Sequence, residues 1–238
     1  MNIANRIDQP GTDEAAWRRW PTLASLPQLE MSDWRSVAVV AAHPDDEVLG
    51  AGGTMAMLAA AGLRLRLIVV TDGEASHPGI PPAVTARIRI AEQTAALGLL
   101  GAGDVEVIRL GLPDTGLTAR EAELTTMLRE HCDEFDACLT PWEEDAHADH
   151  EAAGRATLRA RPDAIRYPVW MWHWAEPADG MVPWQQACQV PLTAAATAQK
   201  RAAIGAFTSQ LTGRPSGGPV VAPGVLAHFT RPQEVFIR

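Results

Sequence analysis

The stretch Val37–Gly62, VAVVAAHPDDEVLGAGGTMAMLAAAG, decides the fold of this chain. It begins with an apolar run of the kind that forms a buried strand. The acids Asp45, Asp46 and Glu47 follow at once, and small apolar residues in a helical pattern come after them. The stretch therefore predicts a strand, a charged turn and a helix, which is how a βαβ unit begins.

The same alternation of short apolar runs and longer helical patterns continues along the chain, and it predicts parallel strands joined by helices. We expect an α/β fold with a Rossmann-like, mostly parallel sheet, helices on both faces, and a site at the carboxyl ends of the strands. The predicted strands are 35–42, 64–71, 105–110, 135–141 and 164–172, and the predicted helices are 49–62, 81–98, 117–132 and 149–160. The remaining predicted segments are a short strand leading into a helix (189–211), a Gly- and Pro-rich loop (211–224) and an edge strand (234–238).

Length and composition indicate one main domain with an extension. The chain has 238 residues, of which 47% are hydrophobic and 21% charged, so a sizeable core is available. We expect residues 1–34, which carry Trp17, Trp20 and Trp34, to pack as an N-terminal extension on a domain of residues 35–238. Neither a signal-peptide pattern nor a bilayer-length apolar run is present, so we expect no membrane partner.

Charge and cysteine content narrow the class of protein. The net charge is -9 and the basic residues are scattered, which argues against a nucleic-acid partner. The cysteines Cys132, Cys138 and Cys188 have neither the spacing of a zinc knuckle nor the even count of a disulfide framework. We interpret them as reduced thiols in a cytoplasmic protein that acts on a small molecule.

Two polar clusters follow predicted strands. HPDDE, His43–Glu47, follows the strand 35–42, and EEDAHADH, Glu143–His150, follows the strand 135–141. Because ligands bind at the carboxyl ends of parallel strands, we expect these clusters to share one site. Together they offer two histidines and one carboxylate, which with water is the ligand set of a hydrolytic zinc centre.

The spacing suggests roles for the individual side chains. His43 and Asp46 are placed to hold one ion, and either His147 or His150 would supply the third ligand. Asp45, beside a ligand, is placed to accept a proton from water activated by zinc. The histidine that does not bind the metal would stabilise the oxyanion or protonate the leaving amine.

A purely structural explanation also exists for the first cluster. Acids after a proline at the start of a helix are ordinary capping residues. Capping does not account for EEDAHADH at a second strand end, where Asp149 lies between the two histidines and would orient one of them. We therefore favour the metal site.

These motifs resemble the LmbE-like or PIG-L family of zinc-dependent N-deacetylases, whose members remove acetyl groups from N-acetylglucosaminyl compounds. AHPDDE and HADH carry most of the resemblance, which runs from about Val37 to the end of the chain. Further similar segments follow in the family order: TDGE (71–74), RIAEQTAALG (89–98), LGLPDTGL (110–117), KRAAIGAFTSQ (200–210) and EVFIR (234–238).

The resemblance implies a role for each matching residue. His43, Asp46 and His150 would hold the metal, zinc by preference, with another divalent metal such as Fe²⁺ as the alternative. Asp45 would be the general base. His147 would be the polarising or acid histidine. Asp149 would support His147. Arg89 and Asp114 match positions at which family members contact the sugar.

The implied reaction is the removal of an N-acetyl group from an N-acetylglucosamine-type amino-sugar conjugate. The alternatives are an amidase of the same family that acts on another acyl group or on a thiol conjugate, and a non-catalytic carbohydrate-binding relative. The segment Tyr167–Pro177 carries Trp170, Trp172 and Trp174. We interpret it as a core strand, with the lining of an acceptor site as the alternative.

Overall fold

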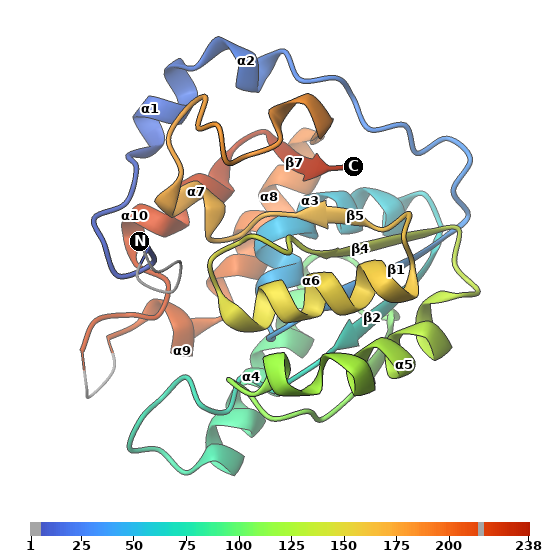
Figure 1. Cartoon of the computed structure of the whole chain (residues 1–238), viewed down its shortest axis with the longest axis vertical. Helices are drawn as coiled ribbons and strands as arrows, with labels where there is room; N and C mark the ends of the chain where they lie inside the picture. The colour runs from blue at the N-terminus through green and yellow to red at the C-terminus, as the bar shows by residue number, and fades with distance from the viewer. Residues whose placement is uncertain (1–5, 214–216) are drawn as a thin grey trace.

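One sheet organises the fold, with its strands in the order β3-β2-β1-β4-β5-β7-β6 (Figure 1). The computed structural model describes residues 6–213 and 217–238. The strands from β3 to β5 pair in parallel, whereas β7 runs antiparallel to both β5 and β6. The mostly parallel α/β fold expected from the sequence is therefore confirmed. The strands are β1 (Ser36–Ala41), β2 (Arg64–Val69), β3 (Glu106–Arg109), β4 (Ala137–Pro141), β5 (Ile165–Tyr167), β6 (Ala187–Pro191) and β7 (Gln233–Ile237).

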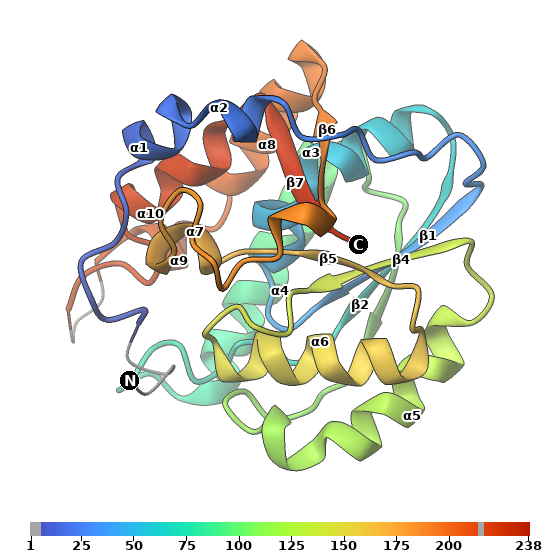
Figure 2. The ribbon, with the colours of Figure 1, turned by 45° about the horizontal axis from the view of Figure 1, so that its top comes forward.

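Helices cover both faces of the sheet (Figure 2). Val37 and Val39 of β1 belong to the core beneath α3 and α8, and the alternate residues Ala38 and Val40 belong to the core beneath α5 and α6. This alternation follows from the two-residue period of a strand. The helices of the described chain are α1 (Glu14–Arg19), α2 (Pro21–Ala24), α3 (Asp46–Ala60), α4 (Pro82–Leu99), α5 (Glu121–Cys132), α6 (Ala148–Ala160), α7 (Met171–Trp174), α8 (Ala194–Gly205), α9 (Thr208–Leu211) and α10 (Pro223–Ala227), with short 3-10 turns η2 (Leu117–Arg120), η3 (Trp184–Gln186) and η4 (His228–Thr230).

Small residues let α3 approach the sheet closely. A Cβ added to Gly50 would lie 2.1 Å from the ring of Tyr167, so a larger residue there would displace either the helix or the ring. Tyr167 is fully buried, and its hydroxyl donates to the carbonyl of Val40 at 2.6 Å. This hydrogen bond ties β5 to β1. The ring of the same tyrosine packs against α3, the helix whose first turn carries acids of HPDDE.

The N-terminal segment, residues 6–34, passes the antiparallel end of the sheet, where Gln28 pairs with Gln189 of β6, and then crosses to the start of β1 (Figure 2). Trp17 is fully buried in the main core, where its ring centroid lies 5.1 Å from that of Trp172. Glu14 accepts hydrogen bonds from His228 and Arg231, near the other end of the chain. Residues 1–5 of the predicted extension lie outside the described residues, and its boundary at residue 34 stays a prediction.

Two predicted strands differ from the structure. The prediction of one strand over 164–172 is wrong beyond Tyr167, because Pro168 has no N–H to donate and the N–H groups that follow turn to Asp145. The strand predicted at 234–238 is β7, which lies between β5 and β6 and not at an edge. Part of the predicted loop 211–224, residues 214–216, lies outside the described residues. Across residues 6–213 and 217–238, no helix is long and apolar enough to cross a membrane.

Candidate active site

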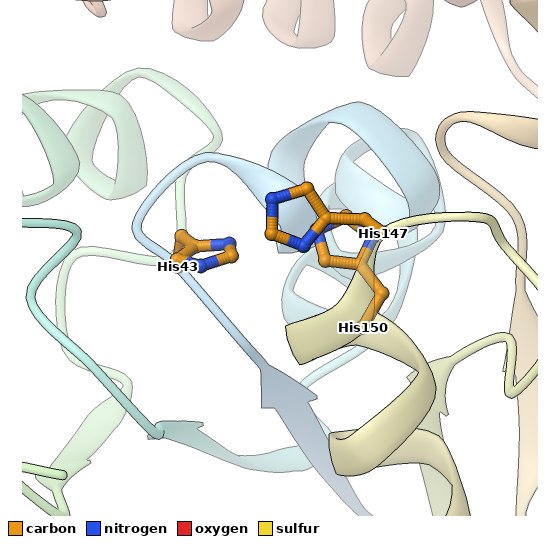
Figure 3. A group of neighbouring side chains, drawn as sticks. All are labelled: His43, His147 and His150. Atoms are coloured by element: carbon orange, nitrogen blue, oxygen red, sulfur yellow. The ribbon is translucent and has the colours of Figure 1, made fainter. Parts of the chain in front are cut away.

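The two polar clusters meet at the carboxyl ends of β1 and β4, which are neighbours in the sheet. His43 follows β1, whereas His147 and His150 come from the start of α6 (Figure 3). The ring centroid of His43 lies 4.9 Å from that of His147 and 5.4 Å from that of His150. These three histidines offer nitrogens within 4.8 Å of one another, a spacing at which one metal ion can be held.

Asp46 lies between two of the imidazoles. Its Oδ2 is 3.5 Å from Nδ1 of His43 and its Oδ1 is 3.1 Å from Nε2 of His150. Asp46 is the first residue of α3, and its Oδ2 also accepts the backbone N–H of His43 at 2.8 Å. The structure thus brings together the residues that the sequence assigned to the metal.

Each of these imidazoles has its other nitrogen against a carboxylate. Nε2 of His43 lies 3.2 Å from Asp114 and 3.3 Å from Asp149, and Nδ1 of His150 lies 2.8 Å from Asp145. Carboxylates in this position orient metal-binding histidines and increase their basicity. The described residues therefore form a buried cluster of histidines and carboxylates that is able to bind a metal ion, and the assignment of His43, Asp46 and His150 as its ligands stays a prediction.

Asp145 is fixed more tightly than an ordinary partner of a histidine. It is fully buried and accepts the backbone N–H groups of Val169, Trp170 and Met171 at 2.9 to 3.0 Å. Its carboxylate therefore joins His150 to the segment after β5. Nothing in the sequence marks Asp145 for this role, because one acid among several in EEDAHADH carries no signal of which backbone groups it will meet.

Asp45 occupies a strained position beside the cluster. Its φ of 132° is unusual for a residue with a side chain, and its side chain does not cap α3. Instead Oδ1 accepts a hydrogen bond from Arg89 at 3.0 Å, and Glu47 accepts the backbone N–H of Asp45 at 3.2 Å. Burial, opposed by Arg89, raises the pKa of Asp45 to about 6. Capping thus does not explain Asp45, and its pKa suits a proton acceptor near neutral pH.

Two residues expected to act elsewhere lie against His43. Asp149 was expected beside His147, but its carboxylate accepts the N–H groups of Thr115 and Leu117 and contacts His43. Asp114, expected to meet a sugar, shares the same nitrogen of His43.

Arg89, the other residue expected at the sugar, lines the same cavity. Its guanidinium also donates to the carbonyls of Pro44 and Gly73. The sugar-binding roles of Arg89 and Asp114 stay predictions.

The protonation of the histidines follows from burial and from these contacts. Burial lowers the pKa of His43 and of His150, but the surrounding carboxylates outweigh it. They raise the pKa of His43 well above its usual value and that of His150 to about 9. Burial and the two neighbouring imidazoles lower the pKa of His147 to about 3, so His147 is neutral at pH 7. The backbone N–H of Asp149 donates to Nδ1 of His147 at 3.3 Å, which places the proton of the neutral ring on Nε2.

A cavity of about 160 Å³ opens over this cluster. One part of its wall is polar and includes the catalytic candidates already described, and another part is apolar. The lining residues are His43, Asp45, Asp46, Leu49, Ala75, Ser76, Arg89, Asp114, Thr115, His147, His150, Val169, Trp170, Gln210, Val220 and Val221.

Comparison with known proteins identifies the family to which the chain belongs. The model of the family described as GlcNAc-PI de-N-acetylase, PIG-L, matches residues 38–161, which is more than half of the chain and includes both clusters. The chain belongs to the PIG-L family. The resemblance noted in the sequence is therefore confirmed.

One curated relative matches most of this chain. The 1D-myo-inositol 2-acetamido-2-deoxy-alpha-D-glucopyranoside deacetylase of Kineococcus radiotolerans is 29% identical over 204 residues, covering 69% of this chain and 53% of the relative. The chain thus spans about half the length of that curated relative.

Solved structures support the fold. The conserved protein TT1542 of Thermus thermophilus has a TM-score of 0.61 at 28% identity, with 85% of this chain and 93% of that chain covered. The N,N'-diacetylchitobiose deacetylase of Pyrococcus horikoshii has a TM-score of 0.58 at 22% identity, with 75% and 71% covered. The second likeness concerns the fold alone, because one fold serves many reactions.

Proposed function

We propose that this protein is a zinc-dependent hydrolase that removes the N-acetyl group from an N-acetylglucosamine-type amino-sugar conjugate. The observation that carries the proposal is the convergence of His43, Asp46 and His150, each buried and with both histidines braced by carboxylates. Membership of the PIG-L family and the deacetylase activity for which the Kineococcus relative is named support the substrate class.

The metal would be held by His43 Nδ1, an oxygen of Asp46 and His150 Nε2. A bound zinc ion supplies Lewis-acid chemistry, polarising the acetyl carbonyl and lowering the pKa of a water molecule. Asp114, Asp149 and the buried Asp145 keep the two imidazoles oriented, so little reorganisation is needed when the ion binds. Fe²⁺ is the alternative ion for the same donor set.

Asp45 would act as the general base. Its carboxylate lines the cavity next to the ligand Asp46, and its pKa of about 6 leaves it mostly ionised at pH 7, ready to take a proton from the attacking water. Arg89 holds the carboxylate in place through Oδ1 and opposes the rise in its pKa. The proton that Asp45 receives can pass to the departing nitrogen, which gives acetic acid and a free amine, and the acid then loses its proton to the amine to give acetate and an ammonium group.

His147 would stabilise the negative charge that develops on the acetyl oxygen. Since its Nδ1 accepts the N–H of Asp149, its Nε2–H is free of that contact and can donate to the oxyanion. Removing one donor of this kind typically slows an acyl-transfer enzyme by about 10²- to 10³-fold. The neutral state of His147 suits a hydrogen-bond donor better than a strong acid.

Acetate release from a panel of N-acetylglucosamine conjugates tests the proposal. The protein is measured as purified, after chelation, and after zinc or Fe²⁺ is restored. We expect release that chelation abolishes and metal restores. Release that survives complete removal of metal would contradict the role of the ion, and no release by the metal-loaded protein from any conjugate would contradict the substrate class.

We also propose a cytoplasmic setting, because all three cysteines are buried thiols.

A further inference from the structure

The cavity over the polar cluster also has an apolar part to its wall. Trp170, Val220 and Val221 line this wall, and the side chains of the two valines have no atom that can form a hydrogen bond. Trp170 and Val220 are half-buried, and Val221 is buried. Water against such a wall is displaced favourably by an apolar group.

The backbone of Trp170 is held by hydrogen bonds, and its side chain packs in part against the main core. Its backbone N–H donates to Asp145 at 2.9 Å and its carbonyl accepts the N–H of His173 at 2.9 Å. His173 in turn contacts the N-terminal segment, because its carbonyl accepts the N–H of Thr12 at 2.8 Å and its Nε2 lies 2.9 Å from the carbonyl of Gln9. The backbone that carries the ring is thus fixed before any ligand arrives, which lowers the entropy lost on binding.

The other two tryptophans of this segment are held by contacts with further tryptophan rings. Trp172 packs edge-on against Trp17, and Trp174 stacks on Trp142 and donates its indole N–H to the carbonyl of Asp145. Within the described part of the chain, the indole N–H of Trp170 makes no hydrogen bond and its ring contact is with the edge of His173 at 6.2 Å. Trp172 and Trp174 are therefore held by other tryptophans, whereas the ring of Trp170, which packs in part against the main core and against His173, also lines the cavity.

We propose that Trp170, Val220 and Val221 form an acceptor subsite that binds an apolar, preferably flat, group attached to the amino sugar. This inference rests on the proposed function, because it places the sugar and its acetyl group against the polar cluster of the same cavity. Indole rings bind flat groups by stacking, and the valines add apolar contact. The preferred substrates are then amino sugars that carry an aryl or alkyl group, rather than free sugars or polyol conjugates.

The test compares the methyl and phenyl glycosides of N-acetylglucosamine, which differ in the acceptor group alone. Because the acceptor takes no part in amide cleavage, the ratio of their kcat/KM values reports binding of that group. We expect the wild type to favour the phenyl glycoside by about 10-fold, mainly through KM. Trp170→Ala should bring the ratio close to one, and Trp170→Phe should give an intermediate ratio.

Trp34→Ala is the matched control. Trp34 lies two residues before β1, at the end of that strand away from the cavity, so this variant should keep the phenyl preference even if it is less stable. Equal treatment of the two glycosides by the wild type would overturn the subsite. So would a phenyl preference that survives in Trp170→Ala.

Binding separates failure of the subsite from failure of the proposed reaction. Calorimetry with the metal-loaded Asp45→Asn variant measures the affinity for each glycoside without turnover, and Asp45→Asn/Trp170→Ala measures the contribution of the ring. A phenyl preference that the double variant loses would support the subsite even if the wild type released no acetate, in which case the proposed reaction alone fails. Equal affinities for the two glycosides in Asp45→Asn would overturn the subsite whatever the activity.

Discussion

The parallel part of the sheet and its antiparallel end are built in different ways. In the parallel part, HPDDE directly follows β1 and HADH follows β4, so neighbours in sequence and adjacent strands assemble the cluster. At the antiparallel end, contacts join residues far apart, such as Glu14 and Arg231, which are 217 positions apart. The first region concentrates groups that suit chemistry, whereas the second concentrates contacts between the two ends of the described chain.

Asp145 connects the two regions. Its carboxylate contacts His150 on one side and the backbone that leads into α7 on the other, and α7 packs against the N-terminal segment through Trp17 and Trp172. A change at Asp145 should therefore be felt in both regions, while changes placed well inside either region should be felt in one.

The largest effect is expected from Asp45→Asn, in the parallel part. The amide is nearly the same size and can still accept from Arg89, but it cannot take a proton from water. We expect kcat to fall by about 10²- to 10⁴-fold while the bound metal is retained. Acetate release and metal analysis of the same sample measure both quantities, and a variant that loses its metal as well would move Asp45 into the ligand set.

Asp145→Asn should have the next largest effect. The amide NH₂ opposes the N–H groups that the buried carboxylate now accepts, so both His150 and the segment before α7 lose a fixed partner. Metal affinity should weaken by about 10- to 100-fold, as measured by competition with a chelator. The exposed Asp104→Asn is the matched control. If Asp145→Asn bound metal as tightly as this control, the proposed bracing of His150 would be wrong.

Glu14→Gln should act on stability alone. Glu14 accepts hydrogen bonds from the buried Arg231 and from His228, and the amide would leave these donors poorly paired. Loss of hydrogen bonds to a charged group should lower the free energy of unfolding by about 2 kcal/mol. Urea unfolding measures this change, and the metal affinity should equal that of the wild type. A weakened metal site would show that the two regions are not separable at this point.

The smallest expected effect is on the pH dependence of stability. Burial raises the pKa of Glu14, but the hydrogen bonds from His228 and Arg231 outweigh it and lower the pKa from 4.5 to about 2. A lowered folded-state pKa means that the contribution of Glu14 to stability is fully present above pH 4.5 and is lost as the pH falls towards 2. Urea titrations across this range should show a steeper loss for the wild type than for Glu14→Gln. Parallel curves would place the acid sensitivity in other carboxylates.

The same contrast explains what the sequence could predict. The order of strands and helices and the meeting of HPDDE with HADH depend on local patterns and on the geometry of parallel sheets, and these predictions agree with the structure. The strand predicted through Trp172 failed because Asp145, distant in sequence, accepts the N–H groups of residues 169–171. Likewise, nothing local indicates that β7 lies inside the sheet, because its neighbours β5 and β6 come from other parts of the chain.

Within the site, residue types were easier to predict than contacts. The spacing of His43, Asp46 and the HADH histidines suffices to propose a metal centre. The carboxylate of Asp149 reaches His43 because the loop after β3 supplies the N–H groups of Thr115 and Leu117 to hold it there. That loop is distant from HADH in the sequence and becomes its neighbour only when the chain folds. The spacing within HADH therefore could not reveal the contact.

The contact of Glu14 with Arg231 can form only late in synthesis, because the two residues are far apart in the sequence. At about 5 to 20 residues per second, Arg231 is added roughly 10 to 40 seconds after Glu14. Until then Trp17 lacks the side of its pocket that Arg231 provides, where the guanidinium lies 5.8 Å from its ring. The apolar surface of the N-terminal segment is therefore exposed for most of translation, and it is covered when β7 and the turn before it have joined the sheet. Slowing the addition of the last residues should lengthen this exposed interval and favour aggregation of the nascent chain.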